Sequence, residues 1–194
     1  EDGTMLAYGT SDGGSDWRTL HIRYIDSGRN MTETLHWVKF SSLTWTHDSN
    51  GFYYSRYPEP TNPLEDVNEN QKLYYHQLGD AQSEDRLIYE RPDEPEWGFG
   101  GKVSDDGSTL FISTWRSTED LNQIHTLDLT SPEAEITPLF EEWAAGWSVI
   151  ASQGRQAWLW TNLDAPRGRV VSINLDAPAS LTEVIPQSDQ TLKS

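Results

Sequence analysis

The residues of this chain that could take part in catalysis are its serines, histidines and carboxylates. A nucleophilic serine of the hydrolase type needs the pattern Gly-x-Ser-x-Gly between a strand and a helix. The nearest matches are Gly13-Gly14-Ser15-Asp16-Trp17 and Gly146-Trp147-Ser148-Val149-Ile150, and both lack the closing glycine. Both also lie among residues typical of strands and turns. We therefore expect no catalytic residue in this chain.

Metal and cofactor binding are disfavoured by the spacing of the ligand-type residues. The five histidines are scattered, one to a strand or turn, at His21, His36, His47, His76 and His125. The chain has no cysteine, which excludes a disulfide framework, a thiolate zinc site and a cysteine nucleophile. Adjacent carboxylates such as Glu141 and Glu142 could act as an acid and base pair, but in so acidic a chain they are more typical of a solvated surface. We expect no metal and no cofactor.

The charge of the chain limits its partners. It has 31 acidic and 14 basic residues, which give a formal net charge of −17 at pH 7. Nucleic acids and anionic membrane surfaces attract basic proteins, so we expect neither as a partner. No apolar run is long enough to span a bilayer, and the N-terminus shows no signal-peptide pattern. We expect a cytoplasmic location, with the periplasm as the alternative.

A recurring turn followed by a strand indicates how the chain is built. The turn Ser104-Asp105-Asp106-Gly107 precedes the apolar run 110–112 and predicts a β-hairpin, because glycine tolerates the positive φ that such turns need. The same pattern recurs around Gly3, Gly51 and Gly154, so that successive turn glycines lie 48, 56 and 47 residues apart. Intervals of this size are typical of the blades of a β-propeller.

The composition agrees with this interpretation. Nine tryptophans and eight tyrosines, in segments separated by Gly, Asp, Ser and Pro, favour an all-β fold. We expect a partial β-propeller with about four blades, each a four-stranded antiparallel sheet. The predicted blades of this single propeller domain are residues 1–34, 35–92, 93–144 and 145–194, the last including the C-terminal tail. A proline-rich, acidic loop is predicted at residues 58–71 of the second blade.

The first blade is expected to be incomplete, with three strands. The chain starts at the turn that should follow the innermost strand, so the sequence reads as part of something longer. Strands are predicted near residues 32–35 at the end of this blade and over residues 38–45 at the start of the next. An antiparallel sheet that leaves an apolar face uncovered tends to find a partner, so we also expect self-association of the chain.

Several segments resemble the propeller domain of the prolyl oligopeptidase (prolyl endopeptidase) family. The resemblance is carried by SDGGSDW (residues 11–17), VKFSSLTWTHDSNGFYYSRYPEP (38–60), QKLYYHQLGDAQSEDRLIYE (71–90) and DEPEWGFGGKVSDDGSTLFIS (93–113). It implies a seven-bladed propeller joined to an α/β-hydrolase domain that cleaves short peptides after proline with a Ser-Asp-His triad. This chain would supply part of the propeller, which admits small peptides and excludes folded proteins. Its implied partners are the missing catalytic domain and short proline-containing peptides.

The resemblance also implies which residues contact the substrate. The connections between blades, and those between the second and third strands of a blade, should lie at one end and face the catalytic domain. The implied substrate-binding residues are Phe40, Trp97, Gly98, Phe99, Trp115 and Thr118. Asp16 and Trp17 are implied to contact the catalytic domain. The alternative for Phe40 and Trp97 is a place in the core between blades, because most aromatic residues are packing residues.

A second function remains open at the level of the sequence. The chain could be a stand-alone β-propeller module that binds a protein partner through an aromatic and apolar patch. A gene that continues into further blades and a Gly-x-Ser-x-Gly elbow favours the peptidase, whereas a gene that ends here favours the interaction module.

Overall fold

The computed structural model describes residues 3–63 and 65–193, so the expectations for residues 1, 2, 64 and 194 lie outside the described part of the chain. The strands form four antiparallel sheets. By contacts the chain divides into two compact units, residues 1–101 and 102–194. Each unit is described by itself.

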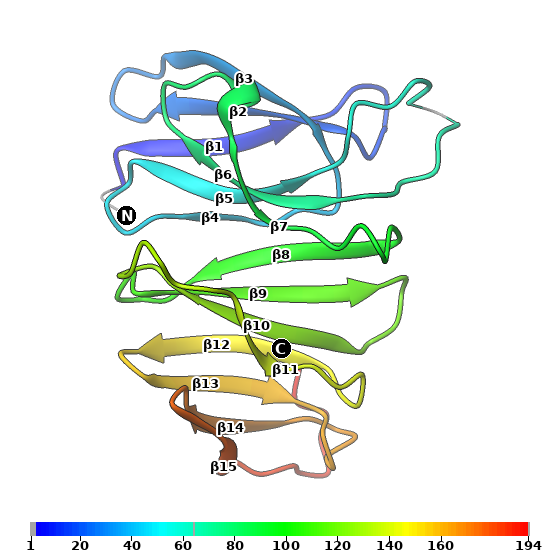
Figure 1. Ribbon diagram of the computed structural model, residues 1–194, viewed down its shortest axis with the longest axis vertical. Helices are drawn as coiled ribbons and strands as arrows, with labels where there is room; N and C mark the ends of the chain where they lie inside the picture. Colours follow the sequence, from blue (N-terminus) through cyan, green and yellow to red (C-terminus); the bar gives the residue numbers. More distant parts are fainter. Residues whose placement is uncertain (1–2, 64, 194) are drawn as a thin grey trace. The chain divides into compact units, whose positions relative to one another are not determined.

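The first unit contains two sheets in which neighbouring strands follow one another along the chain (Figure 1). The first has the order β1-β2-β3, with β1 Met5–Thr10, β2 Arg18–Tyr24 and β3 Asn30–Val38. The second has the order β4-β5-β6-β7, with β4 Leu43–Trp45, β5 Gly51–Arg56, β6 Lys72–Gln77 and β7 Arg86–Tyr89. A short 3-10 helix, Gln82–Glu84, lies before β7.

The remaining strands form two further four-stranded sheets of the same kind. The third sheet consists of β8 Trp97–Val103, β9 Thr109–Arg116, β10 Asn122–Asp128 and β11 Thr137–Phe140. The fourth consists of β12 Trp147–Gln153, β13 Gln156–Thr161, β14 Arg169–Asn174 and β15 Ala177–Ile185. Sheets built from consecutive antiparallel strands are what the propeller prediction requires. The residue ranges predicted for the individual blades stay a prediction.

The strand boundaries near residue 38 differ from those expected. β3 runs to Val38, and β4 begins only at Leu43. The prediction of one strand over residues 38–45 is therefore wrong. The cause is an irregularity in the pairing: Arg18 pairs with Val38, whereas Leu20 pairs with Leu35. This extra residue on β3 is a bulge, which keeps the strand paired for longer and redirects its side chains.

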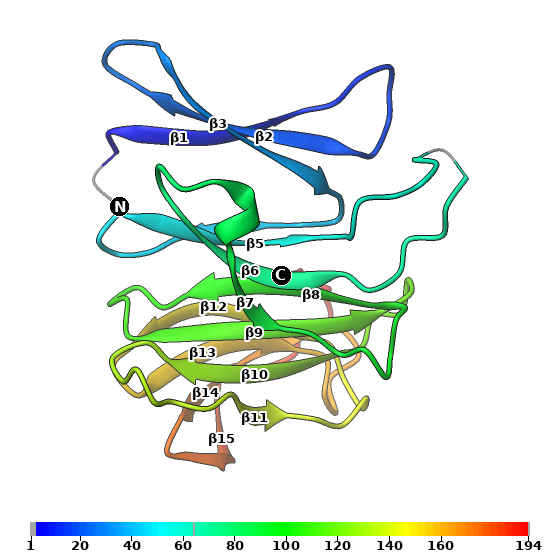
Figure 2. The ribbon, with the colours of Figure 1, turned by 45° about the horizontal axis from the view of Figure 1, so that its top comes forward.

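The core of the first unit lies between its two sheets. Figure 1 and Figure 2 show these sheets one above the other. Buried side chains of β2 and β3 meet those of β5: Leu20, Ile22, Leu35, Val38, Phe52 and Tyr54. On β2, Leu20 and Ile22 are buried and His21 between them is partly exposed, because successive side chains of a strand point to opposite faces.

A buried polar network lies beside this core. The side chain of Asp85 is fully buried, accepts a hydrogen bond from the Tyr54 hydroxyl and lies 2.7 Å from Nδ1 of His76. The Arg56 guanidinium lies 3.8 Å from the same carboxylate. Burial and the neighbouring Asp85 charge raise the pKa of Tyr54, so its hydroxyl stays a donor at neutral pH. The network therefore satisfies a charge that would otherwise be costly to bury.

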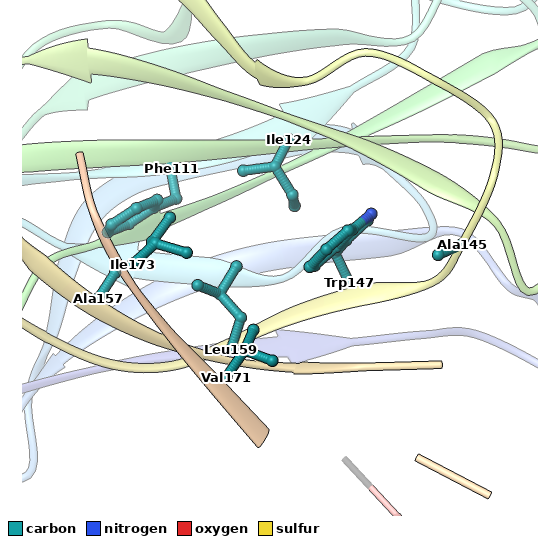
Figure 3. Close-up of a cluster of buried hydrophobic side chains, with 8 residues drawn as sticks. All are labelled: Phe111, Ile124, Ala145, Trp147, Ala157, Leu159, Val171 and Ile173. Carbon is teal, nitrogen blue, oxygen red and sulfur yellow. The ribbon is translucent and has the colours of Figure 1, made fainter. Parts of the chain in front are cut away.

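The core of the second unit is shown in Figure 3. Phe111 and Ile124 come from the third sheet. They meet residues of the fourth sheet and of the segment before it: Ala145, Trp147, Ala157, Leu159, Val171 and Ile173. Phe140 stacks on Trp147 with ring centroids 3.8 Å apart. The third and fourth sheets thus each bury one face against the other.

The same polar turn joins the first two strands of the second sheet, β4 and β5, and of the third sheet, β8 and β9. Thr46 and Ser104 each donate a hydroxyl hydrogen bond to the carboxylate two residues later, Asp48 and Asp106. Asp106 also accepts a hydrogen bond from the backbone N–H of Gly154, 2.8 Å away, and so joins the turns of two neighbouring sheets. These donors lower the pKa of Asp106, the Ser104 hydroxyl contributing most.

Leu159 is fully buried in the second core, so we predict that Leu159→Ala lowers the free energy of unfolding by about 2 to 5 kcal/mol. Chemical denaturation followed by tryptophan fluorescence measures the loss. The matched control is Ile150→Ala, because Ile150 lies on a strand of the same sheet and is 48% exposed. Its cost is expected to stay within about 0.5 kcal/mol. Equal losses in the two variants would contradict the assignment of this core.

Asp106 is expected to make the protein sensitive to acid. Its folded pKa lies below the ordinary value of 3.8, so its contribution to stability is present above that value and is lost as the pH falls through the folded pKa. We predict that Asp106→Asn is less stable at neutral pH, and that its stability falls less steeply than that of the wild type between about pH 5 and about pH 2. Denaturation at a series of pH values tests this, and parallel profiles would refute it.

Candidate functional site

In the first unit, four connections between strands converge at one end of the sheets. The indole N–H of Trp17, after β1, donates to the backbone oxygen of Pro63, between β5 and β6, over 2.8 Å. The backbone N–H of Asn70 in that same long connection donates to the oxygen of Pro95, before β8, over 2.7 Å. The fourth connection, between β3 and β4, begins at Lys39. Asp16, Trp17 and Phe40 lie in these connections, and Trp97, Gly98 and Phe99 begin the strand β8 that follows the last of them.

Lys39 is the charged centre of the site. Its ammonium lies 3.7 Å from the carboxylate of Asp16. It also lies 5.1 Å from the ring centroid of Trp17 and 5.2 Å from that of Phe40. A cation over aromatic faces is attracted by the negative charge of the ring faces. Lys39 therefore brings together three residues that the sequence predicted separately.

Gln71 clamps this group to the next sheet. It is 1% exposed, and its amide nitrogen donates to the backbone oxygen of Lys39 over 2.9 Å and, at 3.4 Å, to that of Phe40. Its amide oxygen accepts a hydrogen bond of 2.6 Å from the backbone N–H of Phe99. The hydroxyl of Ser55 donates to the Phe99 backbone oxygen. One buried side chain thus fixes the β3–β4 connection against β8.

Phe40 is held with its ring in solvent. Its side chain is 56% exposed, so it is not part of the core, and the packing alternative is wrong for this residue. Its backbone has φ of +51°, in the left-handed region that a bulky residue rarely adopts. Such a conformation persists only when the surroundings impose it. The hydrogen bonds from Gln71 provide that restraint.

The segment 97–99 forms the supporting wall. Phe99 is 1% exposed and packs edge-on against Tyr89, with ring centroids 5.2 Å apart. Gly98 is buried, and Trp97 is half-buried with the Arg91 guanidinium 4.5 Å from its ring centroid. Of these three predicted residues, Phe99 is a framework residue, whereas Trp97 retains exposed surface.

Trp115 and Thr118 lie in the second unit, at the end of β9 and in the turn that follows. Trp115 is half-buried, and Thr118 is exposed. Arg116, between them, pairs with Glu119 at 2.9 Å and lies 4.5 Å from the ring centroid of Trp143. This turn therefore repeats the pairing of a cation with an aromatic ring and a carboxylate that Lys39 makes in the first unit.

Lys39 and Gln71 are the residues that the sequence prediction missed. Both stand beside segments that were singled out, since Lys39 precedes Phe40 and Gln71 ends the loop 58–71. A glutamine at the start of a strand carries no signal of burial. Only the approach of two backbone segments, residues 39–40 and Phe99, to one amide shows its role.

The assembled site is built from groups suited to holding a ligand. Its groups are aromatic rings, backbone amides, a paired ammonium and a paired carboxylate, and no nucleophile lies beside a base among them. Within residues 3–63 and 65–193, no three His, Asp or Glu side chains are placed to share a metal ion. Over the same residues, no helix is long and apolar enough for a membrane span. The arrangement can position an extended apolar chain against aromatic surface.

The four antiparallel sheets define the chain as part of a β-propeller. The family described as "Prolyl oligopeptidase, N-terminal beta-propeller domain" matches residues 1–194. The chain belongs to this family. The all-β propeller fold and the resemblance to prolyl oligopeptidases are thereby confirmed.

Known proteins of the same kind match along nearly the whole chain. The chain is 33% identical to prolyl oligopeptidase A of Galerina marginata over 99% of its own length, and 35% identical to the prolyl endopeptidase of Dictyostelium discoideum over 90%. A solved structure from a study of two prolyl endopeptidases covers the whole chain with a TM-score of 0.90 at 33% identity.

A further solved structure, prolyl oligopeptidase B from Galerina marginata bound to a 35mer hydrolysis and macrocyclization substrate, covers 96% of the chain with a TM-score of 0.87 at 28% identity. The chain spans 29% and 26% of the lengths of the two curated relatives, and 28% of each of these solved chains. It therefore corresponds to less than a third of such a protein.

We predict that Gln71→Leu lowers the free energy of unfolding by about 2 to 4 kcal/mol, because it leaves the buried backbone groups of Lys39 and Phe99 without their partner. Denaturant unfolding measures the loss. The control is Gln77→Leu, an exposed glutamine at the end of β6, with an expected change within about 0.5 kcal/mol. A Gln71→Leu variant as stable as this control would disprove the clamp.

Proposed function

We propose that this chain forms part of the substrate-facing wall of a serine peptidase that cleaves short peptides after proline. Its partner would be the α/β-hydrolase domain that carries the catalytic triad. The proposal is supported by membership of the prolyl oligopeptidase propeller family and by relatives named as prolyl endopeptidases over nearly the whole chain. The chain itself would take no part in bond cleavage.

The exposed ring of Phe40 is the observation that carries the proposal. A large apolar side chain held in solvent by a strained backbone and a buried clamp is not explained by packing within the chain. Strained backbone of this kind is concentrated at sites that bind ligands. We assign the ring to an apolar subsite for the peptide residues that precede the substrate proline.

The other proposed contacts follow from their places in the same kind of connection. Trp97 would offer its remaining exposed surface to the peptide, and Phe99 would hold the backbone on which Trp97 stands. Trp115 and Thr118 would contribute from the second unit. Asp16, which is 70% exposed even though it lies near Lys39, and Trp17 would contact the catalytic domain. Gly98, which has no side chain, would shape the wall between Trp97 and Phe99.

The proposed role of the propeller is to select substrates by size. Sheets joined by short connections are stiff, so an opening between them passes a thin extended peptide more readily than a folded domain. This mechanism needs no titrating residue, which agrees with the absence of an acid–base pair among the site residues described above. A relative, prolyl oligopeptidase B from Galerina marginata, has been solved bound to a 35mer substrate.

We predict that Phe40→Ala in the full-length gene product lowers kcat/KM for a peptide with leucine two residues before proline by about 10- to 100-fold. The lost apolar contact is the cause. For a minimal blocked proline amide, which does not reach the ring, kcat/KM is expected to change less than about threefold. Steady-state kinetics with both substrates measure the difference.

The control for this experiment is Leu87→Ala, which removes a 42% exposed apolar side chain from β7. It is expected to leave both substrates unaffected. A gene product that hydrolyses neither substrate would overturn the proposed activity. An equal loss for both substrates in Phe40→Ala would overturn the subsite while leaving the activity in place.

A further inference from the structure

The turn between β4 and β5 contains a reactive pair of residues that the proposed function does not use. Asn50 is exposed and is followed directly by Gly51. In such a pair the backbone nitrogen of the glycine can attack the side-chain amide of the asparagine, because glycine has no side chain to hinder the approach. No other asparagine of the sequence is followed by glycine. The chemistry is therefore confined to this turn.

The reaction open to this pair is a deamidation. The Gly51 nitrogen bonds to Cγ of Asn50 and gives up its proton, the bond from Cγ to Nδ2 breaks, and ammonia leaves with that proton. Water then opens the cyclic imide that has formed. Opening at Cγ gives aspartate at position 50. Opening at the backbone carbonyl carbon gives isoaspartate, in which the main chain runs through the side chain and is longer by one carbon atom.

The folded turn engages both reacting groups. The carboxylate of Asp48 accepts hydrogen bonds from the backbone N–H of Asn50 over 3.1 Å and from its side-chain amide over 2.9 Å. The attacking group, the backbone N–H of Gly51, donates to the Thr46 hydroxyl at 3.3 Å. That hydroxyl donates in turn to Asp48 over 2.6 Å. As long as the turn is closed, the leaving amide and the attacking nitrogen are both held by Asp48 and Thr46.

The equivalent turn of the third sheet shows that this geometry does not require an asparagine. There Ser108 takes the place of Asn50, and its backbone N–H donates to Asp106 over 3.0 Å, as that of Asn50 donates to Asp48. Asn50→Ser is therefore a variant that removes the reactive amide and retains the hydrogen bond on which the turn is built.

Both products fit this turn poorly. The hydrogen bonds to Asp48, above all that from Thr46, lower the pKa of its carboxyl, so it is charged at neutral pH. Aspartate at position 50 would place a second carboxylate where the Asn50 amide now donates to Asp48, and the two like charges would repel. Isoaspartate lengthens the backbone directly before Gly51. That residue is buried so closely that even a Cβ on it would meet the backbone oxygen of His76.

We propose that Asn50 is a site of spontaneous deamidation that the Asp48 hydrogen bonds suppress in the folded protein, so that opening of the β4–β5 turn leads to an irreversible covalent change in the second sheet. Turns open locally without unfolding of the whole domain, and each opening frees the reactive pair. A chain that is modified in this state is lost from the population that refolds. The inference does not depend on the proposed peptidase activity.

The test incubates the full-length gene product in mildly alkaline buffer, digests samples briefly with trypsin and analyses the peptides by chromatography with mass detection. Cleavage after Lys39 and Arg56 releases residues 40–56, in which Asn50 is the single asparagine and glutamine is absent. A gain in mass that corresponds to exchange of an amide for an acid therefore reports on Asn50. The wild type is expected to deamidate at least tenfold (order of magnitude, ~10) more slowly when folded than in urea.

Asp48→Ala removes the acceptor of both Asn50 donors and is expected to speed deamidation of the folded protein about tenfold. The matched control is Asp106→Ala, which removes the equivalent carboxylate from the third sheet and is expected to leave the rate at Asn50 within about twofold. Asn50→Ser is expected to show no change in the mass of this peptide. Asn50→Asp, which reproduces one product, is expected to unfold at lower denaturant concentration than Asn50→Ser. Circular dichroism checks that each variant is folded.

Three results would overturn the proposal. The first is an equal rate in the folded and the urea-unfolded wild type, and the second is an unmodified Asn50 even in urea. The third is a rate that Asp48→Ala does not raise, or that Asp106→Ala raises equally. If Asp48→Ala does not fold, Thr46→Val takes its place, because it removes the acceptor of the Gly51 N–H and is expected to raise the rate about threefold.

Discussion

The structure depends on the need of each antiparallel sheet to bury one face. A three- or four-stranded sheet of this size has two faces and cannot cover either by itself. In each unit two consecutive sheets solve this by packing aliphatic and aromatic side chains against one another, as Leu35 and Phe52 do in the first unit and Phe111 and Leu159 in the second. Because adjacent sheets are joined by short connections, this packing brings the loops of neighbouring sheets together at the same end.

Polar side chains then fix the positions of the loops, which apolar packing does not determine. The hydrophobic effect is not directional, so it does not by itself set the position of a loop. Gln71 sets the β3–β4 connection against β8 through its amide, and Asp106 joins neighbouring turns through the N–H of Gly154. The hydrogen bonds of Gln71 are buried and costly to leave unmade, which makes the geometry specific. The site therefore forms where hydrogen bonds hold the connections of neighbouring sheets together.

The strands themselves could be predicted well, because alternation of apolar and polar residues is a local signal. The prediction failed where the backbone departs from regular geometry. At Trp37 a bulge adds a residue to β3, and the left-handed residues Trp37 and Phe40 move the start of β4 from the expected residue 38 to Leu43. Nothing in the types of these residues signals a positive φ, which glycine would have done. For the same reason the sequence left Phe40 open between substrate contact and a place in the core.

The sequence by itself determined the all-β class, the repeated turn and the absence of a hydrolase elbow, since each depends on residues close together in the chain. The resemblance to prolyl oligopeptidases was also visible there, because it is carried by continuous segments. Tertiary structure alone decided that Lys39 and Gln71 join Asp16, Trp17, Phe40 and Phe99 into one site. These partners lie up to dozens of residues apart, and only the packing of one sheet on the next makes them neighbours.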